Sequence, residues 1–400
     1  MLRRIEIRNY KSIGEVAVEL GPLTVLVGRN AAGKSNFLDA LAFVRDCLAD
    51  SVELAFKNRG GIAAVRRSSG GHPYNIEIRL IMDLDDGVTA DYAYTIRARP
   101  REGFQVARER CIVRRVLDEE VRFEVQDGTF TVGIPGINPR LSKDRLALFA
   151  ASATDDFRPV YDFLTSMQFY SIAPLKLREY QDADEGQVLK RDGSNAAALL
   201  KRLVDDSEHT ARYERVTGLL ARAVEGIVGV EHASVGHQET IRFRQDIGTK
   251  SPWRFDALNM SDGTLRLLGL LLAMYQPSDP PVVAVEEPES TVHPAITELI
   301  VQMLMEASRE RQVLITTHSP EILDFEDLPD EAIKIVVSHQ NSTVIAPLSE
   351  FGRQAIRDGL YTPGELLRIN ELNPDLTTAQ QLSEQLNLFG RPFGEVRAPA

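Results

Sequence analysis

Apolar and polar residues alternate near the N-terminus, which is the pattern of half-buried β-strands. Residues 1–27 predict three strands, and the last of them, residues 23–27, is a short apolar run rich in β-branched residues. Apolar positions then recur at intervals of three and four from Phe37 to Leu48, which predicts a helix with one apolar face. The chain is therefore expected to begin with three strands followed by a helix.

Residues 75–133 alternate in the same way, in two pairs of apolar runs. Each pair is joined by an Asp-Gly dipeptide, at Asp86-Gly87 and Asp127-Gly128, which is a strong signal for a tight hairpin turn. We therefore expect an antiparallel β meander in this part of the chain.

Helical spacing follows the meander and continues, with short interruptions, to a second apolar block that begins at residue 255. The residues from Glu371 onward mix Pro, Gln, Asn and Gly, which indicates a weakly ordered or partner-binding tail. Ser194 is a suitable N-cap for an expected helix over 195–204. We expect helices over 146–167, 195–204 and 210–227, short strands near 169–173 and 239–243, and a polar loop over 175–193.

These patterns divide the chain into four parts. They are a nucleotide-binding core formed by residues 1–57 and 255–350, an antiparallel β lobe at 58–145, a helical lobe at 146–254, and a C-terminal segment at 351–400 that ends in a partly disordered tail. The phosphate-binding motif described next is the reason for assigning the core.

The loop between the third strand and the first helix carries this motif. From Gly28 to Ser35 the sequence fits G-x-x-x-x-G-K-[ST], in the strand–loop–helix context that a phosphate-binding (Walker A) loop requires. Glycines let backbone N–H groups point at phosphate oxygens, and the helix N-terminus adds a positive partial charge. Lys34 would reach the β- and γ-phosphates as a catalytic cation, and Ser35 would offer its hydroxyl to Mg²⁺. The residues expected around ATP are Gly28, Arg29, Asn30, Ala31, Ala32, Gly33, Lys34, Ser35 and Asn36.

A second apolar run, residues 282–285, ends in two carboxylates. An apolar strand that delivers acids beside a nucleotide fits a Walker B motif, in which Glu286 would hold Mg²⁺ and Glu287 would act as general base on the attacking water. By itself, the pattern also fits a strand that enters a solvated turn. Another apolar strand, residues 313–317, ends at His318, whose imidazole would contact the γ-phosphate and sense its loss.

The segment NMSDGT, residues 259–264, precedes a long apolar helix. The Ser261 hydroxyl and the Gly263 N–H would bind an anion at the N-terminus of that helix. The alternative is an ordinary core helix capped by serine, and the segment considered alone favours this alternative.

In this order, the four motifs resemble those of the ATP-binding-cassette (ABC) ATPases of the RecF/SMC/OLD type. The chain looks particularly like the stand-alone "AAA family ATPase" proteins grouped as AAA-21, without the long coiled coil of SMC proteins and without a TOPRIM nuclease domain. Further segments that carry the resemblance are RIEIRNYKSI, EEPESTVHP, TTHSPEIL, and IAPLKLREYQ followed by RDGSNAAALLKRL. The resemblance implies an α/β fold of the P-loop NTPase class and ABC-ATPase head type, with a mixed sheet core, an antiparallel β meander lobe and a helical lobe.

The resemblance also implies a head-to-tail homodimer. ATP held by the Walker A loop of one subunit would be covered by Ser261 and Gly263 of the other, so that two ATP molecules lie in a two-fold interface. ATP binding would create one conformational state, and hydrolysis to ADP and phosphate would reset it.

The sequence departs from the family pattern at three places. The signature is SDGT rather than SGGQ, so Asp262 would bring a negative charge close to the phosphates unless it points away. Glu286 stands where Asp is usual, which would alter the metal geometry slightly. Gln168 precedes its strand instead of following it, so no glutamine is assigned to the Q-loop of the family.

The composition narrows the class of partners. The net charge of −12 over 400 residues excludes a protein that is basic throughout, so DNA would need a local basic patch. No apolar run reaches membrane-spanning length, and the N-terminus lacks the apolar core of a signal peptide. Cys47 and Cys111 form neither a disulfide framework nor a zinc motif, so a reducing, cytoplasmic setting is expected.

Arginines gather in the expected β lobe, where they suggest a DNA-contacting surface. The alternative is a solvated strand edge that resists aggregation, and interleaved acidic residues favour this alternative. The arginines are Arg66, Arg67, Arg97, Arg99, Arg101, Arg108, Arg110, Arg114 and Arg115, and the acids are Glu102, Glu109, Asp118, Glu119 and Glu120.

Three functions compete. The first is an ATP-hydrolysing, RecF/SMC-like dimer that controls DNA repair or antiphage defence through a separate effector such as a nuclease. The second is a non-hydrolysing nucleotide switch or scaffold, which SDGT and Glu286 motivate. The third is the energising subunit of a membrane transporter, although the extended meander and the long middle region look unlike a compact transporter cassette.

Overall fold

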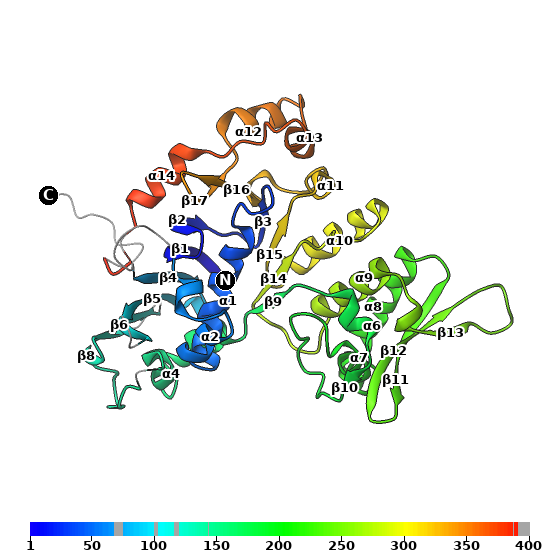
Figure 1. Cartoon of the computed structure of the whole chain (residues 1–400), viewed down its shortest axis with the longest axis horizontal. Coiled ribbons are helices and arrows are strands. Elements are labelled where there is room, and N and C mark those ends of the chain that lie inside the picture. Colours follow the sequence, from blue (N-terminus) through cyan, green and yellow to red (C-terminus); the bar gives the residue numbers. More distant parts are fainter. Residues whose placement is uncertain (68–74, 100–102, 116–119, 143, 387, 391–400) are drawn as a thin grey trace. The chain divides into compact units, whose positions relative to one another are not determined.

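The computed structural model describes residues 1–67, 75–99, 103–115, 120–142, 144–386 and 388–390 (Figure 1). The chain forms two compact units: unit 1 comprises Met1–Met167, Pro329–Tyr361 and Ile369–Ala400, and unit 2 comprises Gln168–Leu328 and Thr362–Arg368. This grouping differs from the four expected segments, because the expected nucleotide-binding core contributes to both units. The assignment of that core stays a prediction.

A seven-stranded antiparallel sheet, in the order β2-β1-β4-β5-β6-β7-β8, is the main layer of unit 1. The expected first two strands and the expected β meander are confirmed. The alternation does not predict β6, because Glu109 and Arg110 are buried there together with apolar neighbours. The strands are β1 (Leu2–Tyr10), β2 (Ile13–Glu19), β4 (Ile76–Asp83), β5 (Thr89–Arg99), β6 (Gly103–Arg114), β7 (Val121–Gln126) and β8 (Thr129–Val132).

A second group of strands in unit 1 supports the Walker A loop. β3 (Leu23–Val27), buried at all five positions, pairs in parallel with β16 (Ile333–His339), and β16 pairs antiparallel with β17 (Ser342–Pro347). Helix α1 (Lys34–Ala49) begins directly after the loop. The expected strand, loop and helix are therefore confirmed. The short helices α2 (Val52–Lys57), α3 (Ile62–Val65), α4 (Ala147–Ala151) and α5 (Arg158–Thr165) complete this part of the unit.

The C-terminal segment packs on unit 1. Helices α12 (Glu350–Arg357) and α14 (Leu376–Glu384) follow β17, and α14 contacts both β17 and β2 (Figure 1). Beyond α14, Leu386 and Leu388 form a small buried cluster with Ala17 of β2. The expectation of weak order from residue 371 is therefore wrong for this stretch, because its apolar side chains cover the sheet; residues 391–400 lie outside the described part.

Unit 2 contains a parallel group of strands in the order β15-β14-β9 and a smaller sheet in the order β10-β12-β11, with β13 beside β12. The helices of this unit confirm the expected helical lobe of an α/β fold. The expected loop at 175–193 is wrong at its start, because Pro174 begins a short helix there. The strands are β9 (Gln168–Tyr170), β10 (Gln181–Asp182), β11 (Ile227–Val235), β12 (Gln238–Gln245), β13 (Trp253–Asp256), β14 (Val282–Glu286) and β15 (Gln312–Thr317).

Helix α9 is the central helix of unit 2, and every residue from Thr264 to Met274 is buried. The other helices are α6 (Pro174–Arg178), α7 (Ala196–Asp205), α8 (Thr210–Ala223), α9 (Asp262–Met274), α10 (Pro294–Ala307), α11 (Pro320–Leu323) and α13 (Pro363–Arg368). In the part of the chain that the structure describes, no helix is long and apolar enough to cross a membrane.

Candidate nucleotide-binding site

The Walker A loop turns sharply between β3 and α1, and two of its positions accept only glycine. A Cβ on Gly28 would lie 2.1 Å from the Val336 carbonyl oxygen, and a Cβ on Gly33 would lie 2.0 Å from the Thr343 hydroxyl oxygen. Gly33 also has a φ of 108°, in the region that disfavours other residues. The loop is therefore packed tightly against the β16–β17 hairpin.

Lys34 begins α1 and is anchored to the loop that precedes it. Its ammonium donates to the carbonyl oxygens of Gly28 at 2.6 Å and Arg29 at 3.1 Å, and only 6% of the residue is exposed. Ser35 is exposed at the start of the same helix, and Asn36 donates to the Ser12 hydroxyl at 2.7 Å. A nearly buried cation and a helix N-terminus in one loop suit an anion such as a phosphate chain.

The two expected acids lie at the end of β14 in unit 2. Glu286 is the last residue of the strand, and Glu287 follows with a φ of 45°. The Glu287 N–H donates to the backbone carbonyl of Thr316 at 3.0 Å and to its hydroxyl at 3.2 Å. A left-handed glutamate costs free energy and persists where surrounding contacts impose it, which marks this turn as a candidate functional position.

The structure brings Glu287 and His318 together. The Nδ1 atom of His318, just after β15, lies 3.2 Å from Oε1 of Glu287, and both side chains are partly exposed. A carboxylate that contacts an imidazole, with access to solvent, can orient and polarise a water molecule. Two of the expected site residues, Glu287 and His318, are therefore in contact within unit 2, and their catalytic roles stay predictions.

A third acid, Glu289, lies beside these residues and is not among the expected site residues. Its carboxylate accepts a 2.5 Å hydrogen bond from the Thr317 hydroxyl. Burial raises the pKa of Glu289, against the lowering effects of the Thr317 hydrogen bond and of His318. The acidic segment EEPE is the signal that would have identified it, because Glu289 follows Glu286 and Glu287 within four residues.

Arg266 ties helix α9 to the acidic strand end, and sequence analysis gives no signal for it. Its guanidinium donates to three carbonyl oxygens, those of Ile172 at 2.6 Å, Glu286 at 3.0 Å and Glu287 at 2.6 Å. Burial lowers the pKa of Arg266, while Glu289, Glu287 and Glu286 raise it. The helix that carries the signature motif and the turn that carries the general-base candidate are thus joined by one buried side chain.

The side chain of Glu286, the expected metal ligand, is held by a cation. Arg191, which lies between β10 and α7, approaches Oε1 of Glu286 at 2.8 Å. Among the described residues, no cluster of three or more His, Cys, Asp and Glu side chains has the arrangement of a metal site. The assignment of Mg²⁺ to Ser35 and Glu286 stays a prediction, in which Arg191 would have to release the carboxylate.

The signature segment acts as a helix cap. The Ser261 hydroxyl accepts from the Thr264 N–H at 3.2 Å and caps α9, as the alternative interpretation expected. A Cβ on Gly263 would lie 2.9 Å from the Thr291 carbonyl oxygen. Asp262 forms a 2.5 Å ion pair with Arg178 of α6, so the negative charge in SDGT is compensated within unit 2. The roles of Ser261 and Gly263 at a partner's nucleotide stay predictions.

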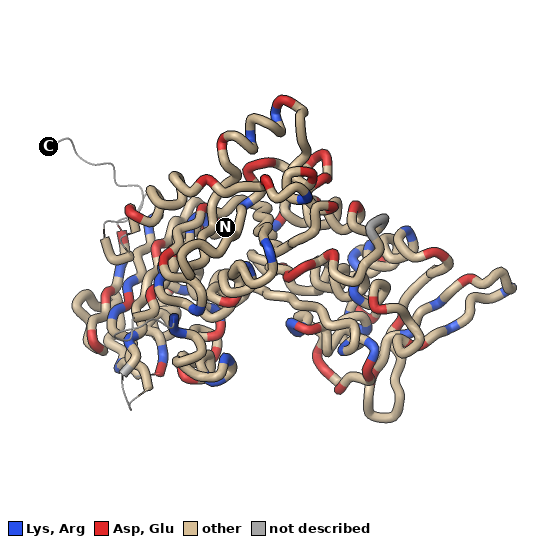
Figure 2. The backbone as a smooth tube through the Cα atoms, turned by 45° about the horizontal axis from the view of Figure 1, so that its top comes forward, with Lys and Arg blue, Asp and Glu red and all other residues tan. Residues whose placement is uncertain are grey.

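The arginines of the β lobe are mostly paired with acids, and Figure 2 shows basic and acidic positions mixed along this lobe. Arg101, Glu102, Asp118 and Glu119 lie outside the described residues, as does the side chain of Arg99. The pairs are Arg97–Asp127, Arg108–Glu124, Arg114–Glu120 and Arg115–Asp156, and the buried Arg110 lies 3.5 Å from Asp91. These pairings favour a charged strand edge over a dedicated DNA surface.

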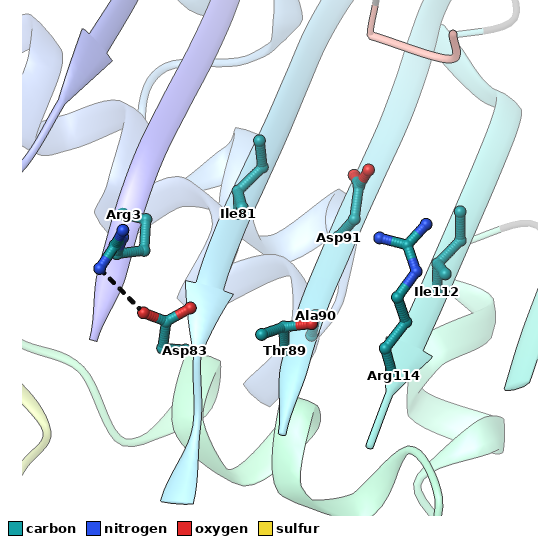
Figure 3. A pocket seen from close by; sticks show the side chains of 8 residues that line it. All are labelled: Arg3, Ile81, Asp83, Thr89, Ala90, Asp91, Ile112 and Arg114. Atoms are coloured by element: carbon teal, nitrogen blue, oxygen red, sulfur yellow. Dashed lines mark ion pairs between the residues drawn. The ribbon is translucent and has the colours of Figure 1, made fainter. Parts of the chain in front are cut away.

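A pocket of about 120 Å³ opens on the seven-stranded sheet (Figure 3). Arg3 and Asp83 form a 3.2 Å ion pair on one side, and Asp91 and Arg114 line the other. This volume is below that of typical ligand pockets, and none of the expected nucleotide residues lines it.

Comparisons with known proteins indicate the class of ATPase to which the chain is similar. A family described as "AAA domain, putative AbiEii toxin, Type IV TA system" matches residues 138–324, and a family described as "AAA ATPase domain" matches residues 1–96. The chain is 41% identical over 44 residues to an OLD nuclease of Thermus scotoductus, which is 11% of this chain and 8% of that protein. It is 32% identical over 100 residues to the DNA repair protein RecN of Xylella fastidiosa, which is 24% of this chain and 18% of that protein.

These curated relatives are matched over less than a fifth of their own length. Among solved structures, the chain resembles the Smc head domain with an extended coiled coil bound to the C-terminal domain of ScpA, derived from Pyrococcus furiosus. The TM-score is 0.56 at 14% identity, over 90% of this chain and 99% of that one. This likeness shows the fold: a P-loop head with a mixed sheet core, a β lobe and a helical lobe.

Proposed function

We propose that the chain, an ABC-type ATPase of the RecF/SMC/OLD kind, binds and hydrolyses ATP as a homodimer. The observation that carries hydrolysis is the contact between Glu287 and His318 at 3.2 Å, on a turn held in a left-handed conformation. Such a pair can act on a water molecule, whereas a loop that only binds phosphate needs neither residue.

The proposed roles follow from the side chains. Lys34 and the N–H groups of the Walker A loop bind the β- and γ-phosphates. Glu287 is the general base, and His318 orients it and contacts the γ-phosphate. Ser35 and Glu286 are the oxygen ligands that would hold Mg²⁺, which neutralises charge on the phosphate oxygens when bound.

The dimer would form across the N-terminus of α9. Ser261 and Gly263 of one subunit would cover ATP held by the other, with the helix N-terminus facing the phosphates. The ion pair between Asp262 and Arg178 supports this arrangement, because it compensates the negative charge that SDGT introduces beside an anion.

We further propose that the ATP-dependent dimer controls a DNA-related process, in DNA repair or antiphage defence, with a separate effector such as a nuclease. The similarity to RecN and to an OLD nuclease supports this proposal, although each match covers a small part of the relative. The related Smc head binds ScpA, which makes a protein partner a reasonable expectation for this chain too. ATP turnover with and without DNA, measured on the same preparation, tests the DNA link.

Two substitutions test the ATPase itself. Lys34→Ala should abolish nucleotide binding, and Glu287→Gln should bind ATP, accumulate as a dimer and release phosphate at least about a hundredfold more slowly. Glu310→Gln, at an exposed glutamate of unit 2, is the matched control and should behave like the wild type. Phosphate release and molecular mass with ATP are the measurements, and unchanged turnover in both site variants would refute the proposal.

The alternative is a nucleotide switch that does not hydrolyse ATP. The pair between Arg191 and Glu286 favours it, because a carboxylate engaged by an arginine is less available to a metal. This alternative expects ATP-dependent dimerisation with negligible phosphate release. Steady multiple turnover by the purified wild type, abolished in the Lys34→Ala variant, would exclude it.

A further inference from the structure

The β16–β17 hairpin meets the Walker A loop through a chain of hydroxyl groups. Gln340 and Asn341 form the hairpin turn with φ values of 49° and 59°. The turn leads directly to Thr343, which is 1% exposed, and the Thr343 N–H donates to the Ser12 carbonyl oxygen at 3.0 Å. A residue near the C-terminal end of the sequence is thereby fixed behind the phosphate-binding loop.

The hydrogen bonds of this contact run in one direction. The Thr343 hydroxyl donates to the Ala32 carbonyl oxygen at 3.0 Å and lies 2.7 Å from the Ser12 hydroxyl. Each hydroxyl has a single proton, so Ser12 must donate to Thr343. Ser12 then accepts from the Asn36 amide at 2.7 Å. The chain of donors therefore begins on α1 and ends on the Walker A loop.

We propose that Thr343 is a positioning residue for nucleotide binding: its hydroxyl fixes the orientation of the peptide between Ala32 and Gly33. A trans peptide is planar, so its C=O and N–H point in opposite directions. With the Ala32 carbonyl held inward by Thr343, the Gly33 N–H points outward, toward the side that receives phosphate. This inference rests on the proposed function and names the residue that orients one of its phosphate donors.

The alternative orientation of the same peptide is unfavourable to an anion. If the peptide turned over, the Ala32 carbonyl oxygen would face the phosphates and the Gly33 N–H would be lost as a donor. Ala32 is buried, so water cannot readily replace the Thr343 hydroxyl as the carbonyl's partner. The close approach of Thr343 to Gly33 also leaves no space for a side chain there.

The test compares two substitutions at one position. Thr343→Val keeps the shape and removes the hydroxyl, and we expect the dissociation constants for ATP and ADP to rise about tenfold, which corresponds to about 1.4 kcal/mol. Turnover at saturating ATP should stay within about threefold of the wild type, because the general base is untouched. Thr343→Ser keeps the hydroxyl and should restore binding to within about twofold. Calorimetry with each nucleotide and steady-state kinetics give both quantities.

Thr95→Val is the matched control, because Thr95 is a buried threonine of β5. It should lower stability without weakening nucleotide binding, which thermal unfolding measured beside calorimetry would establish. Wild-type affinity in Thr343→Val, or equal weakening in Thr343→Val and Thr343→Ser, would overturn the inference while leaving the proposed function intact. Absence of nucleotide binding by the wild type would overturn the proposed function, and the inference with it.

Discussion

Replacing Arg266 by methionine tests whether the signature helix and the acidic turn are mechanically joined. The guanidinium donates three hydrogen bonds to backbone carbonyls, at 2.6, 3.0 and 2.6 Å. A hydrogen bond to a charged group contributes about 1.5–3 kcal/mol, so the gross loss for three bonds is about 4.5–9 kcal/mol. Methionine fills similar space and avoids the cost of burying the cation, which offsets about half of that loss. The expected net loss is about 2–4 kcal/mol in the free energy of unfolding of unit 2.

Urea unfolding measures this loss. Trp253 is the single tryptophan of the chain and belongs to unit 2, so its fluorescence reports this unit. A loss of this size lowers the melting temperature of a unit of this length by about 5–15 °C. The free energy of unfolding of Arg266→Lys should lie between those of Arg266→Met and the wild type, because an ammonium keeps the charge but lacks the planar fork of a guanidinium.

The same substitution should slow ATP hydrolysis, because the Glu287 backbone loses a partner that holds its left-handed turn. Arg309→Met, at an exposed arginine of unit 2, is the control and should change stability by less than about 0.5 kcal/mol. A stability loss below about 1 kcal/mol in Arg266→Met, with normal turnover, would refute the reasoning.

Three further outcomes follow from charged groups. Burial raises the pKa of Glu109 to about 7, above its ordinary value of 4.5, so between pH 4.5 and 7 the folded protein holds a proton that the unfolded chain has released. The free energy of unfolding should therefore fall by about 3 kcal/mol as pH rises through this window. Urea unfolding at pH 5 and pH 8 should show a smaller change with pH in Glu109→Gln than in the wild type. Arg178→Ala should weaken ATP-dependent dimerisation about two- to fivefold by exposing the charge of Asp262. Dimer mass measured by sedimentation should show stronger dimerisation in the Arg178→Ala, Asp262→Asn double variant than in Arg178→Ala, and no change in either variant would count against the pair. Arg191→Ala should lower the Mg²⁺ concentration for half-maximal ATP turnover about two- to fivefold by freeing Glu286, and an unchanged or higher requirement would contradict the competition between the arginine and the metal.

The elements that sequence predicts correctly are those that local pattern determines. Residues 23–27 are apolar throughout because both faces of β3 are buried, and helical spacing begins where α1 begins. The Asp127-Gly128 turn likewise joins β7 to β8, as its composition predicts. Strand β6 escapes the same reasoning, because Glu109 is buried with three donors, the Tyr92 hydroxyl and the N–H groups at the start of α4, and burial of such a residue depends on distant partners.

The candidate site divides in the same way. The Walker A loop, the acidic strand end and the histidine follow from short motifs whose residues are neighbours in sequence. Thr343, Arg266 and Arg191 do not, because each acts on a residue far from it along the chain, and no motif relates the partners. Glu289 is an intermediate case, since it lies within the acidic motif but its burial is visible only in the fold.

The arginine partners change how the departures from the family pattern are interpreted. In the sequence motif, Asp262 is an added negative charge. In the structure, the electrostatic field at the N-terminus of α9 depends on Asp262 and Arg178 together. The two charges lie 2.5 Å apart, so at the distance of a bound phosphate they act as a small dipole rather than as a single charge. A dipole can be oriented to favour or oppose an anion, and the sign of its effect is set by which charge lies nearer. The double variant that removes both charges therefore measures this orientation directly: dimerisation stronger than in the wild type means that the carboxylate faces the phosphates, and weaker dimerisation means that the guanidinium does.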